Sequence, residues 1–193
     1  GHVVSPRINW KWSMNKYHIL RVGIGNGYRV VNLFSEDHAA FSGAREVVII
    51  DNLKPERSWN GTINMSSYIN FAGGFLNIES SLFYTYFCNK IVADYFTNAN
   101  QIIFDNLDGY GVTQGAGLMA HCSFTIPLKI IIGATFTDVH IWEYDETGQL
   151  VKTEQVHAPP LTGNFVVGYT FKKIKLGIDL TGNVYSPMLL PVL

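Results

Sequence analysis

The side chains best suited to binding a ligand gather in one polar segment near the N-terminus, residues 35–51. Carboxylates, an imidazole and a guanidinium lie close together there, and they could hold a polar or charged small molecule. Exposed loops often carry binding residues, although a solvated loop with scattered charges would have the same sequence character. The candidate ligand-binding residues in this segment are Glu36, Asp37, His38 and Arg45, with Glu46 beside them.

A second candidate pair, His140 and His157, flanks another polar stretch, residues 144–160. If that stretch loops out from two neighbouring elements, the imidazoles could meet across its base and share an ion or a ligand. The alternative is a pair of solvated loop histidines. None of the six histidines shows a metal-ligand spacing such as H-x-x-x-H, so the sequence predicts no metal site and no cofactor.

Catalytic chemistry has no comparable support. No Ser/His/Asp order, carboxylate pair or Cys/His motif occurs where a nucleophile would be presented. Asp105 and Asp108 lie close together, but without surroundings that would make either one an acid or a base. Residues 23–28 resemble a nucleotide-binding loop only superficially, because that loop needs a βαβ unit. Cys88 and Cys122 are expected to be separate thiols. The sequence therefore predicts that the chain is not an enzyme.

Bulk composition narrows the class of protein. The formal net charge is −1 over 193 residues, so a nucleic acid is not expected as a partner. Charged residues make up 15%, below the roughly 25% usual in soluble domains, and aromatic residues reach 13%. No apolar run approaches the about 18 residues of a membrane-spanning helix. Residues 1–10 lack the apolar core of a signal peptide, which indicates a processed or internal segment.

The elements that must position the candidate residues are strands, because apolar and polar side chains alternate with a period of two. Successive side chains of a strand point to opposite faces, so each alternating segment has one apolar and one polar face. These segments are residues 8–14, 18–25, 58–69, 76–86, 112–124, 128–137, 164–171 and 174–181. The sequence predicts an all-β fold, an antiparallel meander of about eight long strands.

A soluble sandwich and a membrane barrel both show this alternation, but two further features favour the barrel. The segments persist for roughly ten residues, whereas soluble strands average about five to six and membrane strands need about nine to eleven. Short turns also alternate with long polar loops, which is typical of outer-membrane barrels. The turns are near residues 15–16, 72–74, 126–127 and 172–173, and the loops are near 32–57, 96–108 and 144–160.

Aromatic residues cluster toward the ends of the predicted strands. Trp10 and Trp12 lie near a short-turn end, while Tyr84, Tyr86, Trp142 and Tyr144 lie toward long-loop ends. Such a distribution is expected of the interfacial girdles of a membrane barrel. High β-propensity of aromatic residues is the alternative explanation.

Two motifs resemble the barrel of TonB-dependent outer-membrane receptors. In that family a strand ending in a Gly-rich aromatic-Arg element leads into a loop, and an L-x-P-E element opens the next strand. The matching positions here are Gly25, Gly27, Tyr28 and Arg29, then Leu53, Pro55, Glu56, Ser58 and Trp59. The segments LTGNFVVGYTF and LGIDLTGNVYSP are similar to the family's barrel near its C-terminus. Glycines at 23, 25 and 27 would leave room for a body in the lumen, or let the strand bend.

The resemblance implies a partial barrel domain over residues 1–193. Family barrels have about 22 strands around a plug, so a chain with about eight strands corresponds to a late barrel segment without plug or final strands. The implied function is uptake of a scarce nutrient, an iron chelate or a cobalamin-like molecule, across the outer membrane of a Gram-negative bacterium. The implied partners are outer-membrane lipid, the remaining strands and plug, a small-molecule ligand, and the TonB system through other parts of the receptor.

A self-contained barrel of eight strands is the alternative, as a small outer-membrane protein or a soluble ligand-binding barrel. Closure of such a barrel requires the last strand to pair with the first. Pairing between residues 8–14 and residues 174–184 therefore distinguishes the two hypotheses.

Overall fold

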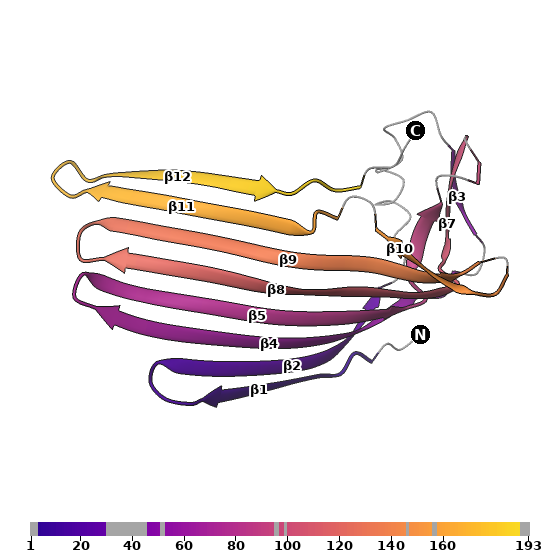
Figure 1. Cartoon of the computed structure of the whole chain (residues 1–193), viewed down its shortest axis with the longest axis horizontal. Helices are drawn as coiled ribbons and strands as arrows, with labels where there is room; N and C mark the ends of the chain where they lie inside the picture. The colour runs from indigo at the N-terminus through magenta and orange to yellow at the C-terminus, as the bar shows by residue number, and fades with distance from the viewer. Residues whose placement is uncertain are drawn as a thin grey trace.

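The main body of the protein is one long antiparallel sheet (Figure 1). The computed structural model describes residues 4–29, 46–50, 53–94, 97–98, 100–145, 147–155 and 158–189. Eight strands follow one another across the sheet in chain order: β1 (Arg7–Ser13), β2 (His18–Arg29), β4 (Glu56–Phe71), β5 (Gly74–Cys88), β8 (Gly109–Phe124), β9 (Leu128–Tyr144), β11 (Leu161–Phe171) and β12 (Leu176–Tyr185). The predicted all-β meander of eight long strands is therefore confirmed.

Four short strands lie at one end of the sheet, and the sequence did not predict them. β10 (Leu150–Glu154) pairs with the far half of β9, while β3 (Glu46–Ile49), β7 (Gln101–Asn106) and β6 (Ile91–Asp94) form a separate small sheet. Figure 1 shows β3, β7 and β10 gathered at one end, with the short turns at the other. The predicted division into a short-turn end and a long-loop end is confirmed, but parts of the loops are folded.

The long sheet is open. β1 and β12 lie at its two opposite edges, and in the described part of the chain β1 pairs only with β2 while β12 pairs only with β11. The pairing that a self-contained eight-strand barrel requires is therefore not formed, and that alternative is wrong for this structure. Among the described residues, no helix is long and apolar enough to cross a membrane.

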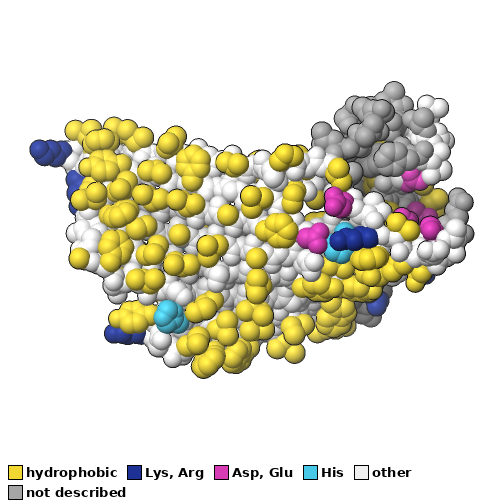
Figure 2. All heavy atoms as spheres, viewed as in Figure 1, with side chains coloured by type: hydrophobic (Ala, Val, Ile, Leu, Met, Phe, Trp, Pro, Cys, Tyr) yellow, Lys and Arg dark blue, Asp and Glu magenta, His cyan; other side chains and the backbone are white. Residues whose placement is uncertain are grey.

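The two faces of the sheet differ sharply in chemistry. We call the apolar face the side carrying Ile24, Ile63, Leu82, Leu118 and Ile132, and the polar face the side carrying Arg21, Asn64, Ser81, Gly117 and Thr135. Leu118 and Ile132 are 57% and 58% exposed, and Figure 2 shows apolar side chains spread over the strands with no second layer above them. A soluble sandwich would bury this face against another sheet, so the sandwich does not describe this fold. An exposed apolar face suits contact with hydrocarbon.

Candidate functional site

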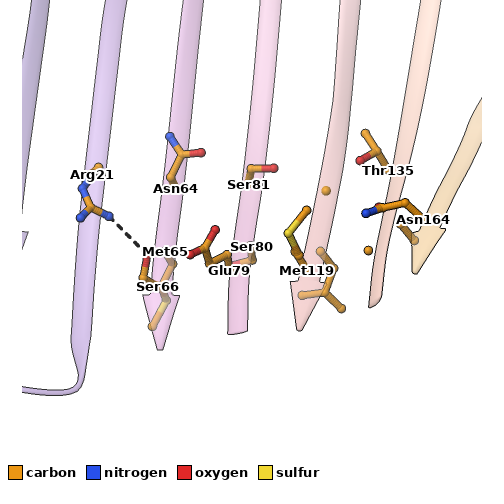
Figure 3. A pocket seen from close by; sticks show the side chains of 14 residues that line it. Arg21, Asn64, Met65, Ser66, Glu79, Ser80, Ser81, Met119, Thr135 and Asn164 are labelled. Atoms are coloured by element: carbon orange, nitrogen blue, oxygen red, sulfur yellow. Dashed lines mark hydrogen bonds between the residues drawn. The ribbon is translucent and has the colours of Figure 1, made fainter. Parts of the chain in front are cut away.

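A hollow of about 380 Å³ lies on the polar face, in the middle of the sheet (Figure 3). Side chains from six strands line it: Arg21 from β2, Asn64 and Ser66 from β4, Glu79 and Ser81 from β5, Met119 from β8, Thr135 from β9 and Asn164 from β11. Strand register explains why they meet. Arg21, Asn64, Ser81, Gly117 and Thr135 form one cross-strand row, and Ser66, Glu79, Met119, Gly133 and Asn164 form the next.

Two glycines of the lining, Gly117 and Gly133, lie beneath side chains of neighbouring strands. Ser81 lies over Gly117 and Asn164 lies over Gly133, each so close that a Cβ atom on the glycine would clash with the neighbouring side chain. Ser81 and Asn164 therefore lie along the sheet, over the glycines of the next strand.

Glycines of β2 repeat the same arrangement. Asn9 lies over Gly23, Arg7 over Gly25 and Ser58 over Gly27. These glycines were predicted to leave room inside a lumen or to let the strand bend. In the structure the space directly over them is taken by polar side chains of the neighbouring strands.

The groups lining the hollow can form hydrogen bonds but are not arranged for covalent chemistry. Arg21 Nη1 donates to Ser66 Oγ at 3.3 Å, and Asn77 Nδ2 donates to Glu79 Oε1 at 2.9 Å. Amides, hydroxyls, one guanidinium and one carboxylate can receive a polar body of mixed donors and acceptors. In the part of the chain that the structure describes, no group of three or more His, Cys, Asp or Glu could hold a metal ion.

The two motifs that resemble the receptor family lie side by side at the long-loop end of the sheet. β2 and β4 are paired so that Arg29 faces Glu56 and Asn26 faces Trp59, and Pro55 directly precedes β4. Proline cannot donate to a strand ladder, which explains its position immediately outside the strand. The two motifs therefore form the walls of a single hairpin, as their sequences indicated.

Glu56 also ties this hairpin to the next loop. The side chain is 9% exposed, and its Oε2 accepts a hydrogen bond from the backbone N–H of Ile91 at 3.2 Å. Lys90 lies beside it and donates from Nζ to Gln155 Oε1 at 2.5 Å. Burial lowers the pKa of the Lys90 ammonium group, and the Glu56 carboxylate partly opposes that shift. One carboxylate thus helps to hold the end of the first loop region against the start of the second.

Asn106 makes a second tie between the same regions. Its Oδ1 accepts from the N–H of Lys54 at 2.6 Å, and its Nδ2 donates to the carbonyl oxygens of Lys54 and Asn89, each at 2.9 Å. The small sheet continues this connection, because β3 and β7 pair in parallel although they come from different loops. The described parts of the two loop regions therefore form one folded unit.

We expect Glu56→Ala to loosen this unit by about 1–3 kcal/mol, because the part-buried N–H of Ile91 loses its acceptor and Lys90 loses its neighbouring carboxylate. Hydrogen exchange of the amides of residues 91–106 in the folded protein measures this effect. Glu56→Gln is the matched control, since it keeps an acceptor oxygen and should exchange more slowly than the alanine variant. Equal exchange in wild type and alanine variant would contradict the role given to Glu56.

Of the predicted ligand-binding residues, only His140 is described by the structure, and Glu36, Asp37, His38, Arg45 and His157 lie outside the described residues. His140 lies within β9 and not in a loop. It is 6% exposed, its Nδ1 is 3.3 Å from Asp138 Oδ2, and its ring meets Trp142 edge to face. The residue facing it on β10 is Glu154.

The hollow was missed by sequence reasoning, although a usable signal existed. Asn64 and Ser81 lie at equal distances on either side of the turn at residues 72–73, so counting outward from the turn places them opposite each other. Counting polar positions outward from each successive turn in the same way predicts which residues share the cross-strand row that lines the hollow. Charged residues are denser in the predicted loops than along this row.

Aromatic side chains lie toward both ends of the strands. The rings of Trp10 and Trp12 in β1 are tilted against each other with 5.9 Å between their centroids, and β1 leads into the turn near residues 15–16. Toward the opposite end, the rings of Tyr86, Tyr110 and Trp142 form a cross-strand stack with centroid distances of 5.2 and 6.1 Å. The arrangement has the pattern of interfacial girdles, and Tyr110 joins the residues that the sequence indicated.

The fold is shared with solved transport proteins. The FrpB iron transporter from Neisseria meningitidis (F5-1 variant) aligns with a TM-score of 0.65 and 18% sequence identity, over 93% of this chain and 26% of that chain. The F3-3 variant aligns with a TM-score of 0.64 and 16% identity, with the same coverage. The copper transporter OprC aligns with a TM-score of 0.60 and 16% identity, over 86% of this chain and 23% of that chain.

The chain thus spans about a quarter of the length of these transporters. No curated protein matches its sequence significantly. The sequence does match the family described as TonB dependent receptor-like, beta-barrel, over residues 1–187. That match covers nearly the whole chain and agrees with the open sheet, its two faces and its motif hairpin. The chain is a segment of a barrel of the TonB-dependent receptor family, to which it belongs.

Proposed function

We propose that residues 1–193 are one partial barrel domain in the wall of a receptor that takes up a scarce nutrient, an iron chelate or a cobalamin-like molecule. The observation that carries this proposal is the family match over residues 1–187. The named neighbours FrpB and OprC transport iron and copper, which supports a metal-containing cargo. Proteins of this family are transporters and not enzymes.

The two faces of the sheet support a position in the outer membrane of a Gram-negative bacterium, where receptors of this family reside. The apolar face would contact lipid, and the polar face would line the lumen. The unpaired edges of β1 and β12 cannot face hydrocarbon, because exposed backbone groups have no partners there. The remaining strands of the barrel would cover these edges, and a plug would occupy the lumen. Coupling to the TonB system would pass through parts of the receptor outside this segment.

Ligand binding is assigned to the long-loop end. Glu36, Asp37, His38 and Arg45 are the proposed contacts from the first loop, with His140 and His157 from the third. The folded unit of β3, β6 and β7 supports this assignment, because it joins two loop regions at the outer end of the barrel. A ligand that touches one loop would therefore be sensed by the other.

Uptake by the complete receptor that contains this chain tests the proposal. The receptor is expressed in cells lacking their own receptors, with or without TonB, and given radiolabelled ferric chelate, cobalamin or copper. We expect TonB-dependent accumulation of the ferric chelate or of cobalamin. Accumulation of copper alone would show that the cargo is copper and not a ferric chelate or cobalamin. A correctly inserted receptor that accumulates none of the three would refute the proposal.

Arg45→Gln is expected to raise the KM for uptake by about ten-fold, the size of a lost hydrogen bond to a charged group. Lys16→Gln is the matched control, because Lys16 lies in a turn at the opposite end of the sheet and should leave KM unchanged. Similar KM values for Arg45→Gln and wild type would remove Arg45 from the ligand site.

A further inference from the structure

The apolar face of β4 changes in chemistry along the strand. Arg57, Trp59, Gly61 and Ile63 share this face, because alternate residues of a strand point to the same side. A cation at the long-loop end is thus followed by an aromatic ring, by a position without a side chain and by an apolar side chain. Strands rise about 3.3 Å per residue, so the series from Arg57 to Ile63 extends over about 20 Å.

A groove opens in the apolar face at Gly61. No atom lies within 4 Å of the place where a Cβ atom of this residue would be, and the groove has a volume of about 310 Å³. Its walls are Ile24 from β2, Ile63 from β4, and Leu82 and Tyr84 from β5, each about half exposed. Hydrocarbon lines the groove on both sides, and the groove is continuous with the apolar face. An alkyl chain therefore suits it better than a polar ligand does.

Two cations lie in one cross-strand row at the long-loop end of this face. We call this row the outer row; it runs over five strands and consists of Arg57, Cys88, Tyr110, Trp142 and Lys152. Arg57 and Lys152 are exposed at its two ends, about 19 Å apart across the sheet. Between them the rings of Tyr110 and Trp142 are stacked. The outer row thus offers a cation at each end of an aromatic surface.

Hydrogen-bonding groups lie between the outer row and the groove. Gln114 and Asp138 are in the same cross-strand row as Gly61, and Gln114 Nε2 donates to Asp138 Oδ2 at 3.0 Å. Glu154 is exposed in the row between that one and the outer row. Figure 2 shows charged side chains and a histidine together on this face near β9 and β10. Carboxylates accept hydrogen bonds from hydroxyl groups, so the ligand that fits carries hydroxyls as well as anionic groups.

We infer that this surface binds one molecule of lipopolysaccharide, a phosphorylated glycolipid of the outer leaflet. An acyl chain occupies the groove at Gly61, and phosphates contact Arg57 and Lys152. The apolar faces of sugar rings pack on Tyr110 and Trp142. A glycerophospholipid has a single phosphodiester and cannot contact both ends of the outer row. The inference rests on the proposed function only in placing the apolar face toward lipid and the long-loop end toward the outer leaflet.

The lipid that stays bound to the complete receptor tests the site. The receptor that contains this chain is purified from outer membranes in mild detergent, and native mass spectrometry counts the lipopolysaccharide molecules on it. We expect Arg57→Gln and Lys152→Gln each to lower the bound amount by about two- to five-fold, the range of an exposed ion pair. Lys129→Gln is the matched control, because Lys129 is an exposed cation on the polar face of β9 and should leave the bound amount unchanged.

Gly61→Leu tests the groove separately from the cations. The new side chain occupies the groove, so lipopolysaccharide binding should weaken by at least about four-fold, the effect of losing contact with one methylene group. A leucine that faces hydrocarbon costs the barrel nothing in burial, and a heat-dependent gel shift checks that each variant is folded. Folded variants of Arg57, Lys152 and Gly61 that all keep the wild-type amount of lipopolysaccharide would overturn the inference.

A comparison of lipids requires no variant. Wild-type receptor in bilayer discs of phosphatidylcholine is titrated with lipopolysaccharide, with dephosphorylated lipopolysaccharide and with phosphatidylglycerol. We expect saturable binding of intact lipopolysaccharide only. Equal binding of phosphatidylglycerol, or of the dephosphorylated form, would overturn the inference, because one phosphate or none would then suffice. Neither readout requires transport, so failure of uptake and failure of lipid binding are separate results.

Discussion

Ile132→Arg is expected to lower the free energy of unfolding of the barrel by about 2–4 kcal/mol, the cost of a cation near the middle of the bilayer. Ile132 lies in the interior of β9 and is 58% exposed on the apolar face. Its neighbours in register are Ala120 and Phe165, so the strands alongside offer no carboxylate to accompany the new charge. Urea titration of the complete barrel folded into lipid, followed by tryptophan fluorescence, measures the change.

Thr135→Arg is the matched control on the same strand. Thr135 points to the opposite face, where it borders the polar hollow and an arginine can stay in water. Substitutions that face the lumen avoid the cost of entering lipid, so a loss below about 1 kcal/mol is expected. Equal losses at positions 132 and 135 would show that the apolar face does not contact hydrocarbon.

The long strands could be predicted from sequence because each of them repeats its pattern many times. β4, β8 and β9 have 16, 16 and 17 residues, and the alternation seen within them at residues 58–69, 112–124 and 128–137 repeats often enough to define both period and face. Their order followed from the short turns, which allow only neighbouring antiparallel strands to pair. The openness of the sheet did not follow from alternation, which says nothing about which edges meet, but it was implied by the resemblance to part of a larger barrel.

The small sheet could not be predicted for a physical reason. Glu46–Ile49 and Gln101–Asn106 are too short for their alternation to show, and they pair in parallel across a large separation in sequence. Near this small sheet, Glu56 and Asn106 join the loop bases through hydrogen bonds to backbone groups. Such contacts leave no periodic trace. The family resemblance located Glu56, but the hydrogen bond to Ile91 became visible only in the folded chain.

Only part of the candidate site could be predicted from the sequence. The polar hollow follows from register, so Asn64 and Ser81 could have been placed opposite each other by counting from a turn. His140 was assigned to the base of a loop because it precedes the polar stretch of residues 144–160. In the structure β9 continues past it, because β10 folds back and extends the ladder with Glu154 opposite His140. The return of the chain as a strand, and not the local composition, determines where His140 lies.

Gly109→Ala is expected to destabilise the barrel by about 2–4 kcal/mol, from steric overlap and the loss of a hydrogen bond. Gly109 begins β8, and a Cβ atom there would overlap the carbonyl oxygen of Trp142 in β9. Relief of that overlap must move the strand ends apart. The movement would lengthen the 3.1 Å hydrogen bond from the Tyr144 N–H to the Asp108 carbonyl and disturb the Tyr110–Trp142 stack.

Gly61→Ala provides a control with the opposite expected sign. A Cβ atom at Gly61 would meet no other atom within 4 Å, and it would lie on the apolar face between its register partners Ile24 and Tyr84, which line the same shallow groove. Alanine also restricts the unfolded chain, which stabilises a compatible site by about 0.4–1 kcal/mol. Urea titration should therefore order the variants as Gly61→Ala, wild type and Gly109→Ala, with near-ultraviolet circular dichroism changing only for Gly109→Ala. If Gly109→Ala were as stable as wild type, β8 and β9 could not approach as closely at this end as their register requires.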